Sequence, residues 1–306
     1  MQFTMRPYRG EDDFWKIRNF LRDVMIANGL REYSWHIARL DYWRWHVADA
    51  VGMTTIDDVI FIWEAPDGHI AAVLNPEAPG EAHFQVHPHY NSPELAADML
   101  AAAEANLMHE GRLVVFADSA DTQRMDLLQA RGYTRGEWPE HQWRHDFDIP
   151  VPDVPAPAGF TLRALGGAEE LPARSWCSWR AFHPDDPDDK YQGHDWYARN
   201  IQREPLYRRD LDIIAVPEGE SFVVAAFTTI WYDDVTRTAY FEPVGTAPEY
   251  QRRGLGRALL MEGLRRLQHL GCKRAFVGGY SEAANGLYRA VFSDDHDLSV
   301  PWIKEA

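Results

Sequence analysis

The chain repeats a pattern at about half its own length, and this repeat constrains the fold more than any other feature. Three pairs of segments match in the same order at offsets of 157 or 160 residues: FTMRPY (3–8) with FTLRAL (160–165), VHPHYNSPELAADML (86–100) with TAPEYQRRGLGRALL (246–260), and LLQARGY (127–133) with LYRAVF (287–292). A single short match could be accidental, but three matches at nearly one spacing indicate a duplicated domain.

A proline-rich segment separates the two copies. IPVPDVPAPA, at residues 149–158, has four prolines in ten residues, a composition typical of a semi-rigid extended linker. At 306 residues, the chain is long enough for two ordinary domains. We therefore predict a first domain at residues 1–148, a linker at 149–158 and a second domain at 159–306.

The second copy reads as a regular series of strands and helices. Strands are expected at 160–165, 211–216, 221–232, 238–247 and 273–280, and helices within 167–206 and at 254–270 and 282–291, before a final strand. Leucines at helical spacing fill the segment 254–270, and Gly271 follows as a stop signal. The order predicts an α/β fold with a mixed, mostly antiparallel sheet flanked by helices. One strand–helix–strand crossover should place two strands parallel.

Composition excludes several classes of partner. The net charge of −16 argues against non-specific nucleic-acid binding, which depends on Lys and Arg at phosphates. No apolar run approaches the roughly 20 residues of a membrane span, and MQFTMRPYRG lacks the apolar core of a secretory signal. We therefore expect a cytoplasmic protein with no membrane partner.

The sequence gives no sign of a metal site or a disulfide framework. Cys177 and Cys272 are the only cysteines and form no C-x-x-C pair. The histidines have no carboxylate partners at ligand spacing along a helix. We predict no bound metal.

QRRGLGRALL, at residues 251–260, is a candidate binding site for a phosphate group. Gly254 and Gly256 let the backbone approach a ligand closely at the start of the helix, where N–H groups lack partners and the helix dipole favours anions. Arg252, Arg253 and Arg257 can add charge-assisted contacts to phosphates. The stretch fits neither a Walker loop nor a dinucleotide fingerprint. A solvated helix start is the alternative interpretation.

The context of this loop resembles one family. PEYQRRGLGRALL is similar to the coenzyme A loop of the GNAT superfamily of N-acetyltransferases, with its pattern [RQ]-x-x-G-x-[GA], and SEAANGLYRAVF is similar to the helix that follows in that family. The resemblance covers residues 160–303 by motif and the first half by layout only. The two-copy design resembles tandem GNAT proteins of the mycothiol synthase type. It implies two tandem GNAT folds and acetyl-CoA as the co-substrate.

The resemblance also assigns roles to residues of the second copy. Tyr288 is the expected general acid, and Glu242 is the expected general base, because even spacing along its strand should turn it toward the cofactor. The expected cofactor-binding residues are Val244, Gly245, Thr246, Gln251, Arg252, Arg253, Gly254, Leu255, Gly256, Arg257, Ala258 and Asn285. The alternatives are a core aromatic for Tyr288, a salt-bridged strand residue for Glu242 and a helix-surface residue for Asn285.

The first copy departs at the chemical positions. Gly254 is replaced by Glu94, a carboxylate where a pyrophosphate would lie, and Tyr288 is replaced by Leu128. The expected function is acetyl transfer to a small-molecule primary amine by the second domain, in one direct step. The alternative is a non-catalytic acyl-CoA-binding sensor or interaction protein. The acceptor amine, the acyl chain length and the oligomeric state are not determined by the sequence.

Overall fold

The computed structural model describes residues 2–53 and 55–305 and divides into two compact units. The first unit contains residues 1–142 and 296–306, and the second contains residues 143–295. The predicted domains therefore differ from these units in their assignment of residues 143–148 and of the final strand. Within the described residues, no helix is both long and apolar enough to cross a membrane.

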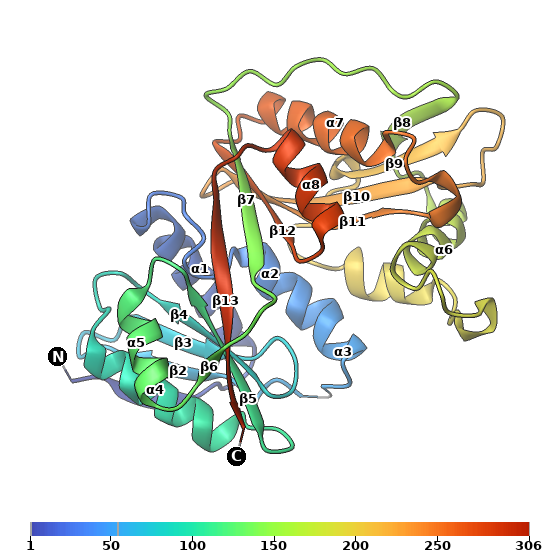
Figure 1. Ribbon diagram of the computed structural model, residues 1–306. Helices are drawn as coiled ribbons and strands as arrows, with labels where there is room; N and C mark the ends of the chain where they lie inside the picture. The colour runs from blue at the N-terminus through green and yellow to red at the C-terminus, as the bar shows by residue number, and fades with distance from the viewer. Residues whose placement is uncertain (1, 54, 306) are drawn as a thin grey trace. The chain divides into compact units, whose positions relative to one another are not determined.

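The first unit is a mixed sheet with helices (Figure 1). Its strands are β1 (Thr4–Pro7), β2 (Phe61–Glu64), β3 (Ile70–Asn75), β4 (Glu81–Val86), β5 (Arg112–Asp118), β6 (Thr134–Arg135), the start of β7 (Glu140–Asp146) and β13 (His296–Glu305). Its helices are α1 (Glu11–Ala27), α2 (Ile37–Tyr42), the π-helical η1 (Trp43–Val47), α3 (Ala48–Ala50), α4 (Pro93–Asn106) and α5 (Thr122–Ala130). The sheet order is β1-β2-β3-β4-β5-β13, and β6 also pairs with β13.

The second unit repeats this plan. Its strands are the end of β7, β8 (Phe160–Ala164), β9 (Asp212–Pro217), β10 (Ala226–Asp233), β11 (Thr238–Thr246) and β12 (Arg274–Gly279). Its main helices are α6 (Leu171–Phe182), α7 (Leu255–His269) and α8 (Glu282–Val291). Short helical turns are η2 (Ala168–Glu170), η3 (Asp188–Lys190), η4 (Tyr197–Ile201), η5 (Arg209–Leu211) and η6 (Pro248–Tyr250). The sheet order is β7-β12-β11-β10-β9-β8.

The predicted α/β plan is confirmed, including its crossover. β11 and β12 run parallel and are joined by α7, and β4 and β5 run parallel in the first unit. The leucines predicted at helical spacing form the buried face of α7 and pack into one core with β9, β10 and β12. Only the strand predicted at 221–232 begins late, at Ala226, because residues 221–222 form a turn and residues 223–225 have no regular structure.

The last strand of each sheet comes from the other half of the chain. β13, at the C-terminus, pairs antiparallel with β5 of the first unit, from Ser299 opposite Asp118 to Glu305 opposite Arg112. β7 instead reaches the second unit, where it neighbours β12 and Trp143 joins the core. The linker follows β7 and packs Val151 and Val154 against that same core. Each sheet is therefore completed by a strand distant in sequence.

Candidate functional site

The site of the second unit begins where two parallel strands part. β11 and β12 pair from Thr238 opposite Arg274 to Tyr240 opposite Phe276, and β11 then continues to Thr246 without that partner. β4 and β5 part in the same way in the first unit, after Ala82 opposite Val115. Parting strands expose backbone N–H and C=O groups, which an extended ligand arm can pair with.

The loop that follows β11 leaves the start of α7 without a side-chain cap. Gly254 is the N-cap residue in a left-handed conformation, with φ 79°, and no side chain accepts from the first turn. The preceding Arg252 is also left-handed, with φ 60°. The first N–H groups of α7 and the positive end of its dipole therefore remain available to an anion.

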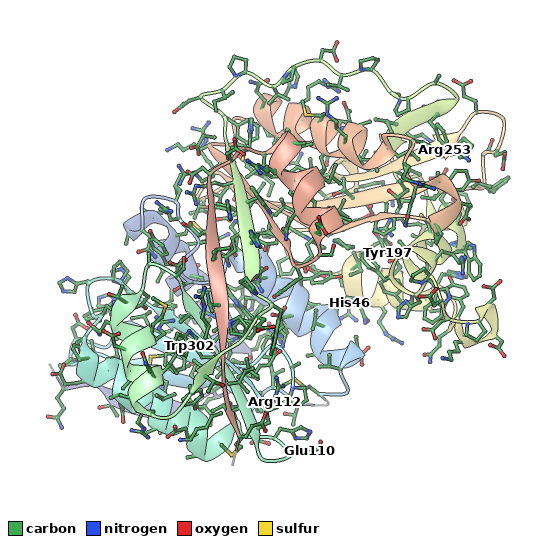
Figure 2. All side chains as sticks on the ribbon, in the orientation of Figure 1. His46, Glu110, Arg112, Tyr197, Arg253 and Trp302 are labelled. Atoms are coloured by element: carbon green, nitrogen blue, oxygen red, sulfur yellow. The ribbon has the colours of Figure 1, made fainter. Side chains whose placement is uncertain are left out.

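The three arginines of this loop surround the helix start and are exposed. Arg253 lies beside the ring of Tyr250, with its guanidinium carbon 5.3 Å from the ring centre, and donates a 3.1 Å hydrogen bond to the carbonyl of Glu249 (Figure 2). Arg252 and Arg257 are likewise exposed. Gln251 donates a 3.3 Å hydrogen bond to the carbonyl of Thr246 and so joins the loop to the end of β11. The predicted residues 251–254 and Arg257 thus lie together at the start of α7.

Two glycines in this region permit close packing. A Cβ on Gly256 would lie 3.0 Å from the side chain of Leu287 in α8 and 4.0 Å from the Thr246 hydroxyl. A Cβ on Gly245 would lie 2.4 Å from the ring of Phe227. The end of β11, the start of α7 and α8 therefore converge around these two glycines.

Glu242 of β11 acts electrostatically on Tyr288 of α8. Tyr288 is 7% exposed, and its ring makes an edge contact with Phe292. Burial raises the pKa of Tyr288, and the charge of Glu242 raises it further. Both effects keep the phenol protonated at neutral pH.

The spacing argument for Glu242 does not hold along this strand. The register between β10 and β11 shifts, so that Thr228 lies opposite Val244 while Ile230 lies opposite Phe241. Phe241 and Val244 both pack against the core beneath α7 although they are three residues apart. An irregular strand breaks the alternation of faces, and even spacing therefore cannot place Glu242 on the same face as Val244 and Thr246.

Asn285 contacts β7 inside the second unit. Its side-chain oxygen accepts a 2.9 Å hydrogen bond from the indole of Trp143. A Cβ on Gly279, at the end of β12, would lie 2.5 Å from that same oxygen. The bond to Trp143 joins α8 to a strand that the sequence placed in the other domain.

The first unit closes the corresponding helix start with its own side chains. Ser92 caps α4 by accepting a 3.2 Å hydrogen bond from the Leu95 N–H. Glu94 lies in the first turn, where its carboxylate complements the helix dipole. The two helix starts therefore differ as the sequence suggested, one capped and acidic, the other uncapped and basic.

A buried ion pair links α6 to β9 of the second sheet. Arg174 of α6 and Asp212 of β9 are both fully buried, with 3.6 Å between Nε and Oδ1. Tyr197, labelled in Figure 2, donates a 2.7 Å hydrogen bond to Asp212, and Arg174 donates to Thr229. This network fixes α6 against β9 and β10.

Comparisons with known proteins agree with this arrangement. Residues 170–292 match the model of the Acetyltransferase (GNAT) family. A mycothiol acetyltransferase from Saccharopolyspora erythraea is 27% identical over 226 residues, which cover 67% of this chain and 68% of that protein. A mycothiol acetyltransferase from Pseudarthrobacter chlorophenolicus is 25% identical over 241 residues, which cover 76% and 72%.

Solved structures extend the similarity of fold to the whole chain. A GCN5-related N-acetyltransferase from Sphaerobacter thermophilus matches with a TM-score of 0.65 and 17% identity, over 99% of this chain and 95% of that one. A tandem GNAT protein from the clavulanic acid biosynthesis pathway matches with a TM-score of 0.64 and 17% identity, over 99% and 98%. Residues 170–292 are thus similar in sequence to the Acetyltransferase (GNAT) family, and the whole chain is similar in fold to the solved GNAT and tandem GNAT structures.

Proposed function

We propose that the second unit binds acetyl-CoA and transfers its acetyl group to a primary amine of a small molecule. The observation that carries this proposal is the uncapped start of α7, with left-handed Gly254 and three exposed arginines, beside the point where β11 and β12 part. A helix start of this kind suits a pyrophosphate. The end of β11, at Val244, Gly245 and Thr246, would pair through its main chain with the pantetheine arm.

The chemistry needs one proton acceptor and one proton donor. The amine nitrogen attacks the thioester carbonyl carbon, and Glu242, whose charge acts on Tyr288, takes the proton that the nitrogen loses. The carbon–sulfur bond then breaks, and Tyr288 donates its proton to the leaving thiolate. The raised pKa of Tyr288 supports its role as a donor, because the phenol holds its proton throughout the neutral range.

Transfer without a covalent enzyme intermediate is supported by the state of the cysteines. Cys177 and Cys272 are both buried, and burial raises the pKa of each thiol to about 12. The thiolate is the reactive form of cysteine, so neither side chain suits an acyl carrier. The amine would therefore attack acetyl-CoA directly, with both molecules bound at the same time.

Two measurements test the proposal together. Acetyl-CoA is titrated calorimetrically, and release of the CoA thiol is followed with a panel of primary amines. Tyr288→Phe should lower kcat about 100-fold or more while leaving the Kd for acetyl-CoA within about threefold. Tyr133→Phe removes a hydroxyl from a similarly buried tyrosine of the first unit and serves as the control.

Each outcome separates the candidate functions. Binding of acetyl-CoA with no turnover on any amine would favour a non-catalytic acyl-CoA sensor. Turnover that survives Tyr288→Phe would remove Tyr288 from the mechanism. Absence of acetyl-CoA binding would refute the proposal and leave the arginines as a solvated helix start.

A further inference from the structure

Three potential metal ligands meet in the first unit, at the start of β4. Glu77 lies in the turn after β3, and Glu81 and His83 follow two residues apart on one face of β4. One ligand atom from each lies within 4.8 Å of the others. The His83 Nε2 atom is 3.7 Å from a Glu77 oxygen and 4.0 Å from a Glu81 oxygen.

His83 is buried, and its Nε2 atom has no hydrogen-bond partner among the described residues. The residue is 6% exposed, and its ring stacks on Phe116 at 4.6 Å with an interplanar angle of 8°. The Nε2 atom faces the carboxylates of Glu77 and Glu81, and in the tautomer with its proton on Nδ1 it offers a lone pair to a metal ion. An unsatisfied buried acceptor of this kind is costly unless something binds to it.

The charge around the cluster is unbalanced in favour of a cation. Arg39 is shared between Glu77 and Glu140, at 3.2 Å and 2.8 Å. Two other cations act on the cluster, and each has a carboxylate partner: Arg112 pairs with Glu305 at 3.4 Å, and Arg124 pairs with Asp121 at 3.1 Å. One guanidinium therefore faces three carboxylates once Glu81 is included, and a divalent cation would leave the group close to neutral.

The Glu81 carboxylate is held in place by the backbone of the turn that precedes β4. It accepts a hydrogen bond from the Ala78 N–H at 3.1 Å. Two carboxylates and one imidazole are a typical ligand set for a borderline divalent metal.

We propose that Glu77, Glu81 and His83 bind one divalent transition-metal ion, Zn²⁺ or Mn²⁺, as a structural site of the first unit. An ion equidistant from three atoms at these separations would lie about 2.1–2.5 Å from each, which small side-chain movements bring to normal ligand distances. Water would fill the remaining positions. The ion would fasten the turn that contains Glu77 to β4, immediately before β4 and β5 part.

The alternative is that a proton occupies the cluster in place of a metal. Glu81 would then be protonated at neutral pH and share a hydrogen with Glu77. The two possibilities differ in what the variants do. If a metal binds, removing a ligand weakens metal binding. If a proton occupies the cluster, Glu81→Gln imitates the protonated state and stabilises the protein.

The test uses full-length, tag-free protein stripped with EDTA and then titrated with ZnCl₂ or MnCl₂. Metal content per chain is measured by elemental analysis after dialysis, and thermal unfolding is followed with and without metal. We expect one ion per chain, and a rise in Tm of about 3–6 °C at tenfold excess over Kd. His83→Gln and Glu81→Gln should each weaken binding at least about tenfold. His69→Gln, an exposed histidine of the same unit, should bind as the wild type does.

The proposal is overturned by either of two results. One is wild-type protein that retains no Zn²⁺ or Mn²⁺ and shows no metal-dependent shift in Tm. The other is binding that persists unchanged in both His83→Gln and Glu81→Gln. If His83→Gln fails to fold, Glu81→Gln decides alone, because it keeps the shape of the side chain and removes only its charge.

Discussion

Gly254 offers a direct test of the proposed pyrophosphate site, through a pair of substitutions that differ only in charge. The residue is left-handed, with φ 79°, and a Cβ there meets only the ring of Pro157 in the linker, at 3.9 Å. Asn and Asp are the residues besides glycine that visit this conformation most readily. Gly254→Asn and Gly254→Asp should therefore both fold, at similar and modest cost.

The expected difference between the two variants follows from Coulomb's law. If the pyrophosphate binds at the start of α7, the new carboxylate would lie about 5 Å from a phosphate charge. Repulsion at that separation is about 1 kcal/mol in water and about 3 kcal/mol near a protein surface. Gly254→Asp should thus bind acetyl-CoA about 5- to 150-fold more weakly than Gly254→Asn.

Calorimetric titration of acetyl-CoA measures this difference, and salt provides an internal check. The Kd of Gly254→Asn for acetyl-CoA should stay within about fivefold of the wild-type value. The difference in acetyl-CoA affinity between Gly254→Asp and Gly254→Asn should narrow as ionic strength rises, because screening shortens the range of the repulsion. Equal affinities for the Asp and Asn variants at low salt would show that no phosphate approaches Gly254, and the reasoning would fail. We also expect one site per chain, since Glu94 already places a carboxylate in the first unit's helix start.

Three further changes test the scaffold around the sites. Arg174→Met should cost about 3 kcal/mol of unfolding free energy, because it leaves a buried aspartate without its cation; chemical denaturation that shows no loss would contradict this. With EDTA present, the wild type should lose on the order of 1–3 kcal/mol as pH rises from about 4.5 to 7, because the pKa of Glu81 is raised in the folded state. Glu81→Gln should lack this loss. If the unfolding free energies of the wild type and of Glu81→Gln depend on pH in the same way, the loss does not come from Glu81. Gly279→Ala should slow acetyl transfer at least about tenfold, because its Cβ would displace Asn285. Gly286→Ala, next to Asn285 in α8, has open space and should keep the wild-type rate.

Local patterns predicted most of the second unit. Leucine spacing defined α7, and the glycines after β11 marked its uncapped start, because both features depend on residues close together in the chain. The irregularity of β11 was not predictable in this way. A register shift arises from how Thr228 and Ile230 pair across the sheet, and a single strand's sequence does not record its partner's register.

The cluster in the first unit was missed for a related reason. Glu77, Glu81 and His83 have no ligand spacing typical of a helix, and the sequence analysis therefore predicted no metal. A turn and a strand bring them together, and Phe116, from a different strand, holds the imidazole in place. Ligand sets assembled by tertiary structure leave little trace in local sequence.

The exchange of final strands shows the limit of reasoning from a repeat. The repeat correctly indicated two copies of one fold, and it led to the assumption that each copy completes its own sheet. Since the copies share one plan, the position beside β5 resembles the position beside β12, and a strand that fits one can fit the other. β13 fills the first position and buries Val300 and Trp302 in the first core, while β7 fills the second with Trp143. Duplication therefore predicts how many strands each sheet needs, whereas long-range packing decides which part of the chain supplies the last one.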